Sequence, residues 1–254
     1  MGFFTQLYET FGALEDPGFW QEAYMNFYRA WFEADRWKQY FQGLGTTVQV
    51  TVMALLIGVV LGVVVAMIRT AHDQQRPGQH NPLLGITNLI CKVYVTIIRG
   101  TPMMVQLLIM GLVIFASNRN KTLIGALSLG INSGAYVAEI IRGGLMSLDP
   151  GQMEAGRSLG LNYFDTMRFI VIPQAFKAIL PSLGNEFITL LKDTSLISVV
   201  GGKEIVYFAQ AIITRTYETM YPYLITAVMY LILVLIFTWL QGKLERRLRQ
   251  SDRR

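Results

Sequence analysis

The feature that most constrains this chain is a set of four stretches of at least seventeen residues without a charged side chain. They cover residues 46–68, 100–118, 122–138 and 219–242. At about 1.5 Å per residue, a helix over the first stretch crosses a hydrocarbon core about 30 Å thick. Charged residues make up 15% of the chain, whereas soluble domains carry about 25%. The sequence therefore predicts an all-α integral membrane protein and argues against a soluble, disordered or disulfide-rich fold.

A fifth segment, residues 181–200, is apolar except for Glu186, Lys192 and Asp193. Glu186 and Asp193 are seven residues apart, nearly two helical turns, so they share a face with Thr189 between them. A charge at the bilayer centre costs about 2.5–3.5 kcal/mol. This face is therefore expected to meet a cavity or protein partners instead of lipid.

Two interpretations of this polar face stay open. In the functional one, the face lines a translocation path, and Glu186 or Asp193 receives the amino group of a zwitterionic substrate. The hydroxyl groups of Thr189, Thr194 and Ser195 would complete the hydrogen bonding. In the structural one, the charges pair with each other near the membrane surface or bond to a neighbouring helix.

Small residues recur at four-residue spacing within two of the spans. Gly58 and Gly62 lie in the first, and Gly130 and Gly134 lie in the third. This GxxxG spacing lets helices approach closely. We favour the interpretation that these glycines pack helices within one subunit; a dimer interface is the alternative.

The distribution of basic residues predicts the orientation. With the N-terminus outside and five spans, the inner segments hold fourteen of the 22 basic residues and the outer segments hold seven, which leaves Lys192 inside the membrane. This bias follows the positive-inside rule. Six of the fourteen lie in the tail, residues 243–254. We therefore expect a cytoplasmic tail beside lipid headgroups and no nucleic-acid partner.

Residues 1–42 form an N-terminal extension rich in aromatic side chains. The first forty-one residues hold fourteen of the thirty aromatic residues of the chain. Trp20, Tyr24, Phe27 and Trp31 recur at helical spacing, which predicts an interfacial amphipathic helix on the outer face. A membrane anchor is the favoured interpretation, and a docking surface for an external partner is the alternative.

Between the third span and the polar segment, residues 147–181 are predicted to form a cytoplasmic region with two short helices. Asp149 can cap the first helix, which contains Glu154. Gly160 can end that helix before a second one over residues 164–170. The result is a compact knob at the membrane surface.

This region carries a recognisable pattern. Glu-Ala-Gly at residues 154–156 is followed after three residues by Gly160, and after nine more by Ile-Val-Ile-Pro at residues 170–173. The spacing resembles the EAA signature of ABC importer permeases. Two departures, Gly156 in place of alanine and Ile172 in place of leucine, are conservative in size.

Further motifs lie at residues 99–102, 105–107, 135–144, 185–187 and 192–196. With them the resemblance extends to the polar amino acid subfamily and covers about residues 43–242. It implies a type I ABC importer permease, with five core transmembrane helices in residues 43–242. The N-terminal extension precedes this domain and the basic tail follows it.

The resemblance also implies how the chain works with partners. The helix around Glu154 would be the coupling helix that sits in a cleft of an ATP-hydrolysing subunit. Glu154, Ala155 and Gly160 are its motif positions. Ala155 and Gly156 are small enough for close docking, and Glu154 and Arg157 can form charge-assisted hydrogen bonds. The alternative is an ordinary cytoplasmic loop with a buried glycine.

The expected assembly contains a second permease subunit, identical or similar, and two ATP-binding subunits. An external solute-binding protein would deliver an amino acid substrate. The expected location is a bacterial inner membrane, with the N-terminus outside and the C-terminus in the cytoplasm.

The sequence argues against an enzyme. It contains no GxxxxGK(S/T) phosphate loop, so ATP and Mg²⁺ are expected on the partner subunit and no cofactor in this chain. His72 and His80 share one polar loop, and neither a metal site nor catalytic residues are predicted. The chain is thus expected to be the permease subunit of an ATP-driven importer of polar amino acids, with a lean toward basic ones. A self-sufficient channel or proton-coupled carrier is the alternative, and it would need no coupling helix.

Overall fold

The computed structural model describes residues 2–75, 81–149 and 151–251, and all regular elements within these ranges are helical. The all-α expectation is thereby confirmed. His80 and the tail residues Arg253 and Arg254, which entered the sequence predictions, lie outside the described residues.

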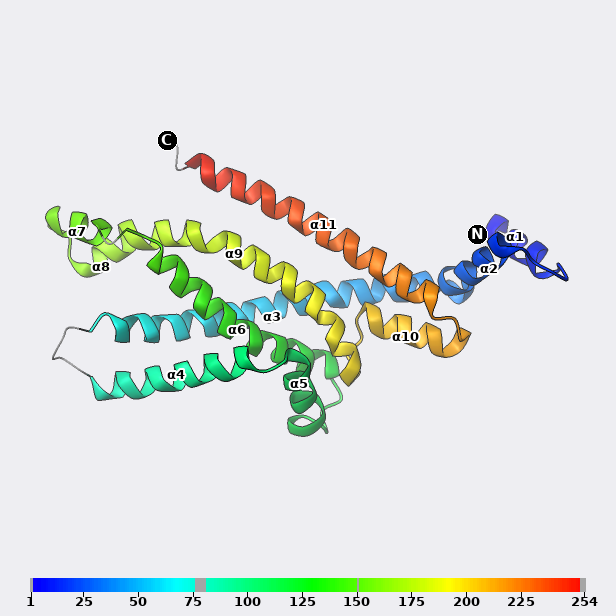
Figure 1. Cartoon of the computed structure of the whole chain (residues 1–254), viewed down its shortest axis with the longest axis horizontal. Coiled ribbons are helices and arrows are strands. Elements are labelled where there is room, and N and C mark those ends of the chain that lie inside the picture. The colour runs from blue at the N-terminus through cyan, green and yellow to red at the C-terminus, as the bar shows by residue number, and fades with distance from the viewer. Residues whose placement is uncertain (1, 76–80, 150, 252–254) are drawn as a thin grey trace.

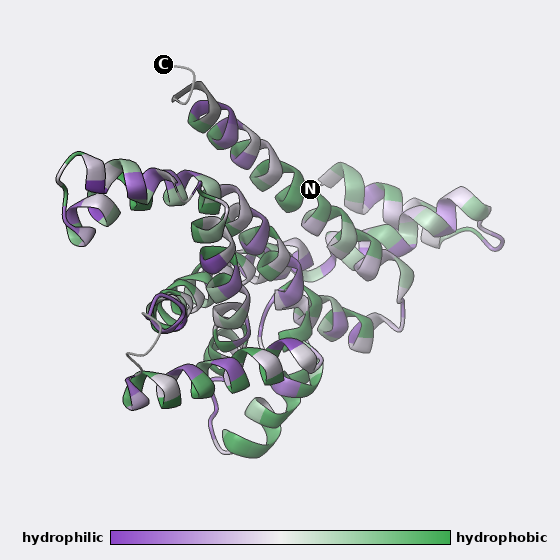
Figure 2. Ribbon diagram, turned by 60° about the vertical axis from the view of Figure 1, so that its left-hand side comes forward, coloured by the Kyte–Doolittle hydropathy of each residue, from purple (hydrophilic) through white to green (hydrophobic). Residues whose placement is uncertain are grey.

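Among the described residues, four helices are long and apolar enough to cross a membrane. Three of them correspond to the predicted spans at residues 46–68, 122–138 and 219–242, the last of which begins one residue before its helix. Figure 2 shows hydrophobic residues along the long helices and hydrophilic residues in the last turns before the C-terminus. The four helices are α3 (Arg36–Asp73), α4 (Pro82–Gly100), α6 (Lys121–Met146) and α11 (Met220–Ser251).

The predicted span at residues 100–118 is wrong. The backbone is extended at Thr101 and Pro102, and only two short helical elements come next: α5 (Met103–Leu108) and the π-helical turn η2 (Ile109–Ile114). The span-length helix is α4, which a search for charge-free stretches misses because it contains Lys92 and Arg99. Both residues are exposed, and long basic side chains can extend toward the membrane surface from an apolar helix.

Helices α3 and α6 pack against each other through the two GxxxG pairs (Figure 1). A Cβ added at Gly58 would lie 2.8 Å from Ser133 Oγ, and one at Gly62 would lie 2.5 Å from Val137 Cγ1. A Cβ at Gly130 would lie 2.7 Å from a side-chain atom of Ile57 on α3. The expectation that the small residues serve packing within one subunit is confirmed.

After α6 the chain forms α7 (Gly151–Ser158) at one end of the molecule and returns through α8 (Tyr163–Thr166) (Figure 1). The prediction of a separate second short helix is wrong. Helix α8 continues through the π-helical turn η3 (Met167–Val171) into α9 (Ile172–Asp193). Pro173 lies just after the π-helical turn, at the point where the backbone changes to α-helix; it has no N–H to donate within the helix.

Helix α9 continues into the 3₁₀ segment η4 (Thr194–Val200), and α10 (Ile205–Thr216) comes after it at a bend of 44°. Together these helices are long and apolar enough to form one broken span.

The N-terminal extension forms α1 (Gly2–Gly12), α2 (Phe19–Trp31) and the short η1 (Glu33–Asp35), which leads into α3. The four aromatic residues predicted to share a helix lie on α2. They do not act as one stripe: Trp31 stacks on Tyr40 at 5.6 Å between ring centroids, whereas Trp20 is 82% exposed.

Candidate functional site

Helix α7 has well-defined ends. Asp149 Oδ1 accepts a hydrogen bond of 2.8 Å from the backbone N–H of Gly151. At the other end, Gly160 has φ +78°, and the N–H of Leu161 donates to the carbonyl of Gly156 at 3.0 Å. This is the Schellman arrangement, in which glycine adopts the left-handed conformation without a steric penalty. Both predicted helix ends are confirmed.

The five predicted coupling residues fall into two groups. Gly156 is buried, and a Cβ there would lie only 2.4 Å from Thr166 Cγ2 of α8. The glycine therefore allows α7 and α8 to pack closely. The alanine that the family pattern has at this position would clash with Thr166 in this chain. The other four residues are exposed: Glu154, Ala155, Arg157 and Gly160.

Two hydrogen bonds connect this region to the long helices. Gln174 Nε2 of α9 donates to Gln152 Oε1 of α7 at 3.0 Å. Tyr163 Oη of α8 donates to Gln74 Oε1, just beyond α3, at 2.5 Å. A displacement of α7 would therefore act directly on α9.

A row of polar side chains connects three helices inside the membrane-spanning part. Ser133 Oγ of α6 donates to Glu186 Oε1 of α9 at 2.7 Å. The neighbouring residue on α6, Asn132, donates through Nδ2 to Gln106 Oε1 of α5 at 3.0 Å. We call Gln106, Asn132, Ser133 and Glu186 the polar row.

Gln106 also fixes the break between α4 and α5. Its Nε2 atom lies 2.8 Å from the carbonyl oxygen of Ile98, 3.1 Å from that of Thr101 and 2.8 Å from Thr101 Oγ1. Sequence reasoning identified only Glu186 of the polar row as a site residue. The only signal for the others was the presence of amide and hydroxyl groups in charge-free stretches.

The predicted substrate residues do not all lie together. Thr189 is exposed, and Glu186, Asp193 and Ser195 are partly exposed. Thr194 is fully buried, and its Oγ1 lies 3.4 Å from Tyr230 Oη of α11. Thr194 and Ser195 both donate to the backbone carbonyl three residues earlier, at 2.7 Å. The structure thus turns Thr194 away from the other four, toward α11.

An ionic cluster joins α3 to α6. Glu139 forms ion pairs with Arg69 of α3 and, at 3.5 Å, with Arg142 one turn further along α6. The three side chains are between 13% and 30% exposed. Opposite charges therefore compensate each other where the two helices approach the α7 end of the molecule.

Residues 83–250 match the family described as binding-protein-dependent transport system inner membrane component. The chain belongs to this family. It is a permease subunit of an ABC importer, and such subunits are non-catalytic.

Two named relatives match most of the chain. The glutamine transport system permease protein GlnP of Escherichia coli K12 is 34% identical over 212 residues, covering 82% of this chain and 92% of that protein. The arginine transport system permease protein ArtQ of Bacillus subtilis 168 is 33% identical over 214 residues, covering 83% and 93%.

Two solved structures cover a similar fraction of this chain. A crystal structure of an amino acid ABC transporter with histidines has a TM-score of 0.73 at 40% identity and covers 83% of this chain and 94% of that one. The methionine transporter MetNI, in an inward-facing conformation, has a TM-score of 0.69 at 19% identity, covering 83% and 96%. The latter likeness concerns the fold alone.

Proposed function

We propose that the permease imports polar amino acids at the expense of ATP, and that α7 is its coupling helix. The observation that carries this proposal is the placement of Glu154, Ala155, Arg157 and Gly160. All four are exposed at one end of the molecule, on a helix with capped ends and a hydrogen bond to α9. ATP and Mg²⁺ bind to the partner ATPase subunit, and α7 transmits the movement of that subunit.

The proposed substrate site is the partly exposed polar face of α9 and η4, formed by Glu186, Thr189, Asp193 and Ser195. The carboxylates receive the amino group of the substrate, and a second positive group would suit them equally, which favours basic amino acids. The names of the relatives are compatible with polar substrates, since they include glutamine, arginine and histidine. Thr194 supports this face from behind through its contact with α11.

The proposed assembly is based on the small number of spans. Four long helices and one broken span are too few to enclose a path, so a second permease subunit completes it. Two ATP-binding subunits and an external solute-binding protein act with the pair. We place the N-terminal extension (residues 1–42) outside, the transmembrane domain at residues 43–242 and the basic tail (243–254) in the cytoplasm of the bacterium.

The substrate site is tested by uptake into proteoliposomes that contain the complete complex. Glu186→Gln and Asp193→Asn are each expected to lower the initial uptake rate by about tenfold or more, because a lost charge-assisted hydrogen bond is worth about 1.5–3 kcal/mol. Glu22→Gln is the matched control, since Glu22 is an exposed carboxylate on α2. Unchanged uptake in both α9 variants, at normal assembly, would contradict the substrate role.

The energy source is tested in vesicles that contain the permease without its ATPase partner. We expect no uptake there, and uptake only when both ATPase subunits and ATP are added. Transport by the permease alone in ATP-free vesicles would instead support a self-sufficient carrier.

A further inference from the structure

A side chain of α11 holds α9 immediately before the proposed substrate face. Gln241 Nε2 donates to the backbone carbonyl of Pro181 at 3.2 Å and to Asn185 Oδ1 at 2.9 Å. It also lies 3.0 Å from Glu245 Oε1 on its own helix. We call Gln241, Pro181 and Asn185 the α9–α11 clasp. Asn185 directly precedes Glu186, the α9 member of the polar row.

The clasp contacts α9 at a turn that lacks one backbone hydrogen bond. Pro181 lies inside the helix and has no N–H to donate to the carbonyl four residues earlier, which makes this a position where a helix bends. Gly184 lies on the same side. A Cβ at Gly184 would be only 3.0 Å from Cγ and Cδ of Gln241, so the stem of the glutamine lies directly against α9.

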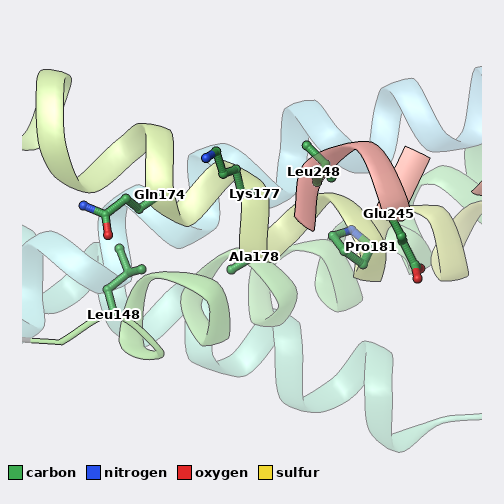
Figure 3. A pocket seen from close by; sticks show the side chains of 7 residues that line it. All are labelled: Leu148, Gln174, Lys177, Ala178, Pro181, Glu245 and Leu248. Atoms are coloured by element: carbon green, nitrogen blue, oxygen red, sulfur yellow. The ribbon is translucent and has the colours of Figure 1, made fainter. Parts of the chain in front are cut away.

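Between α7 and the clasp, α9 and the end of α11 border a cavity of about 380 Å³ (Figure 3). Gln174, which bonds to α7, lines this cavity from α9, and Glu245 and Leu248 line it from α11. Leu148, which precedes α7, completes the wall near the coupling region. The cavity leaves room for this part of α9 to move relative to α11.

We propose that Gln241 is a positioning residue for energy coupling, which locks α11 to the Pro181 turn of α9. When the ATPase displaces α7, the bond from Gln174 moves α9. The clasp then carries this movement to α11 and to the Glu186 face together. Without the clasp, α9 bends at Pro181 and part of the movement is lost. This inference rests on the proposed function, in which α7 is driven by ATP.

The test measures amino acid uptake and ATP hydrolysis together, in proteoliposomes with the complete complex. Gln241→Leu keeps the approximate size but removes the donor. The ratio of uptake to hydrolysis is expected to fall about fivefold, the factor that corresponds to about 1 kcal/mol for a lost hydrogen bond. Hydrolysis itself continues. Gln241→Lys supplies a new donor to the same acceptors, and we expect it to restore most of the ratio.

Thr238→Val is the matched control, because Thr238 is an exposed polar residue one turn earlier on α11; its ratio is expected to stay at the wild-type value. Gly184→Ala provides a second approach, since it crowds Gln241 from the α9 side without removing a polar group. It is expected to lower the ratio in the same direction and by less.

Wild-type ratios in both Gln241→Leu and Gly184→Ala would overturn the inference, as would a Gln241→Lys variant as impaired as Gln241→Leu. These results are distinct from failure of the proposed function, in which the wild-type complex itself would show no ATP-dependent uptake.

Discussion

At the scale of single residues, Gly156 within α7 and Gly160 just after it serve different purposes. Gly160 adopts a positive φ with no other atoms within 4 Å of a built Cβ, so its role is conformational. Gly156 has ordinary helical geometry, but Thr166 occupies the space where a side chain would lie. The role of Gly160 can be predicted from the local sequence, because a glycine directly after a short helix commonly adopts the left-handed conformation that ends it. The second depends on a residue of another helix.

The crowding at Gly156 leads to a prediction about compensation. Gly156→Ala is expected to lower the free energy of unfolding by about 1–3 kcal/mol, because the methyl group overlaps Thr166. Adding Thr166→Ala removes the overlapping atoms and should recover most of the loss. Thermal unfolding of the purified permease measures both effects, and a double variant no more stable than Gly156→Ala would contradict this explanation.

The conformation of Gly160 leads to a second prediction. Gly160→Ala forces a side chain into the left-handed region at about 1–2 kcal/mol, which corresponds to a factor of about 5–30 in an equilibrium constant. We expect affinity for the ATPase subunit to fall by this factor, as measured by titration of the solubilised permease. Gly160→Asn is the control, because asparagine tolerates this conformation. Equal losses in the two variants would argue against a conformational role.

At the scale of elements, the spans without charged residues could be predicted from hydropathy. Helix α4 was missed because charged residues interrupt its apolar sequence. Lys92 and Arg99 break the apolar run of α4, yet both side chains are exposed and the helix has membrane-spanning length. Conversely, residues 100–118 carry no charge, but only Met103–Ile114 is helical, because the backbone is extended at Pro102 and leaves the helix at Phe115. Backbone geometry, in addition to hydropathy, therefore decides where a span begins.

The contact between α3 and α6 gives an element-scale prediction. Gly62→Ala places a Cβ 2.9 Å from the backbone nitrogen of Ala138, so the helices must separate, at a cost of about 1–3 kcal/mol. The unfolding temperature is expected to fall by about 2–4 °C for each kcal/mol.

The matched control for this contact lies on the same helix. Gly45 has no atom within 4 Å of a built Cβ, so Gly45→Ala should leave the unfolding temperature unchanged or raise it, since alanine favours a helix by about 0.5–1 kcal/mol over glycine. A Gly62→Ala variant as stable as Gly45→Ala would exclude tight packing at this site.

At the scale of the whole molecule, α7 and the N-terminal helices lie at opposite ends (Figure 1). The proposed orientation places α7 in the cytoplasm and the N-terminal helices outside. The single cysteine, Cys91, is buried, so an introduced cysteine gives a clean signal. In intact cells, Glu15→Cys is expected to react with a membrane-impermeant maleimide, whereas Ser158→Cys should react only after permeabilisation. The reverse pattern would invert the proposed topology.

The sequence by itself determined the membrane class, three of the spans, the family pattern and both ends of α7. These features depend on hydropathy and capping among residues close together in the chain. Only the tertiary structure decided the polar row, the clasp and the burial of Thr194. Ser133 and Glu186 are 53 residues apart, and Gln241 and Asn185 are 56 apart. Which side chains meet across such separations depends on the rotation and crossing of packed helices, and local patterns do not encode that geometry.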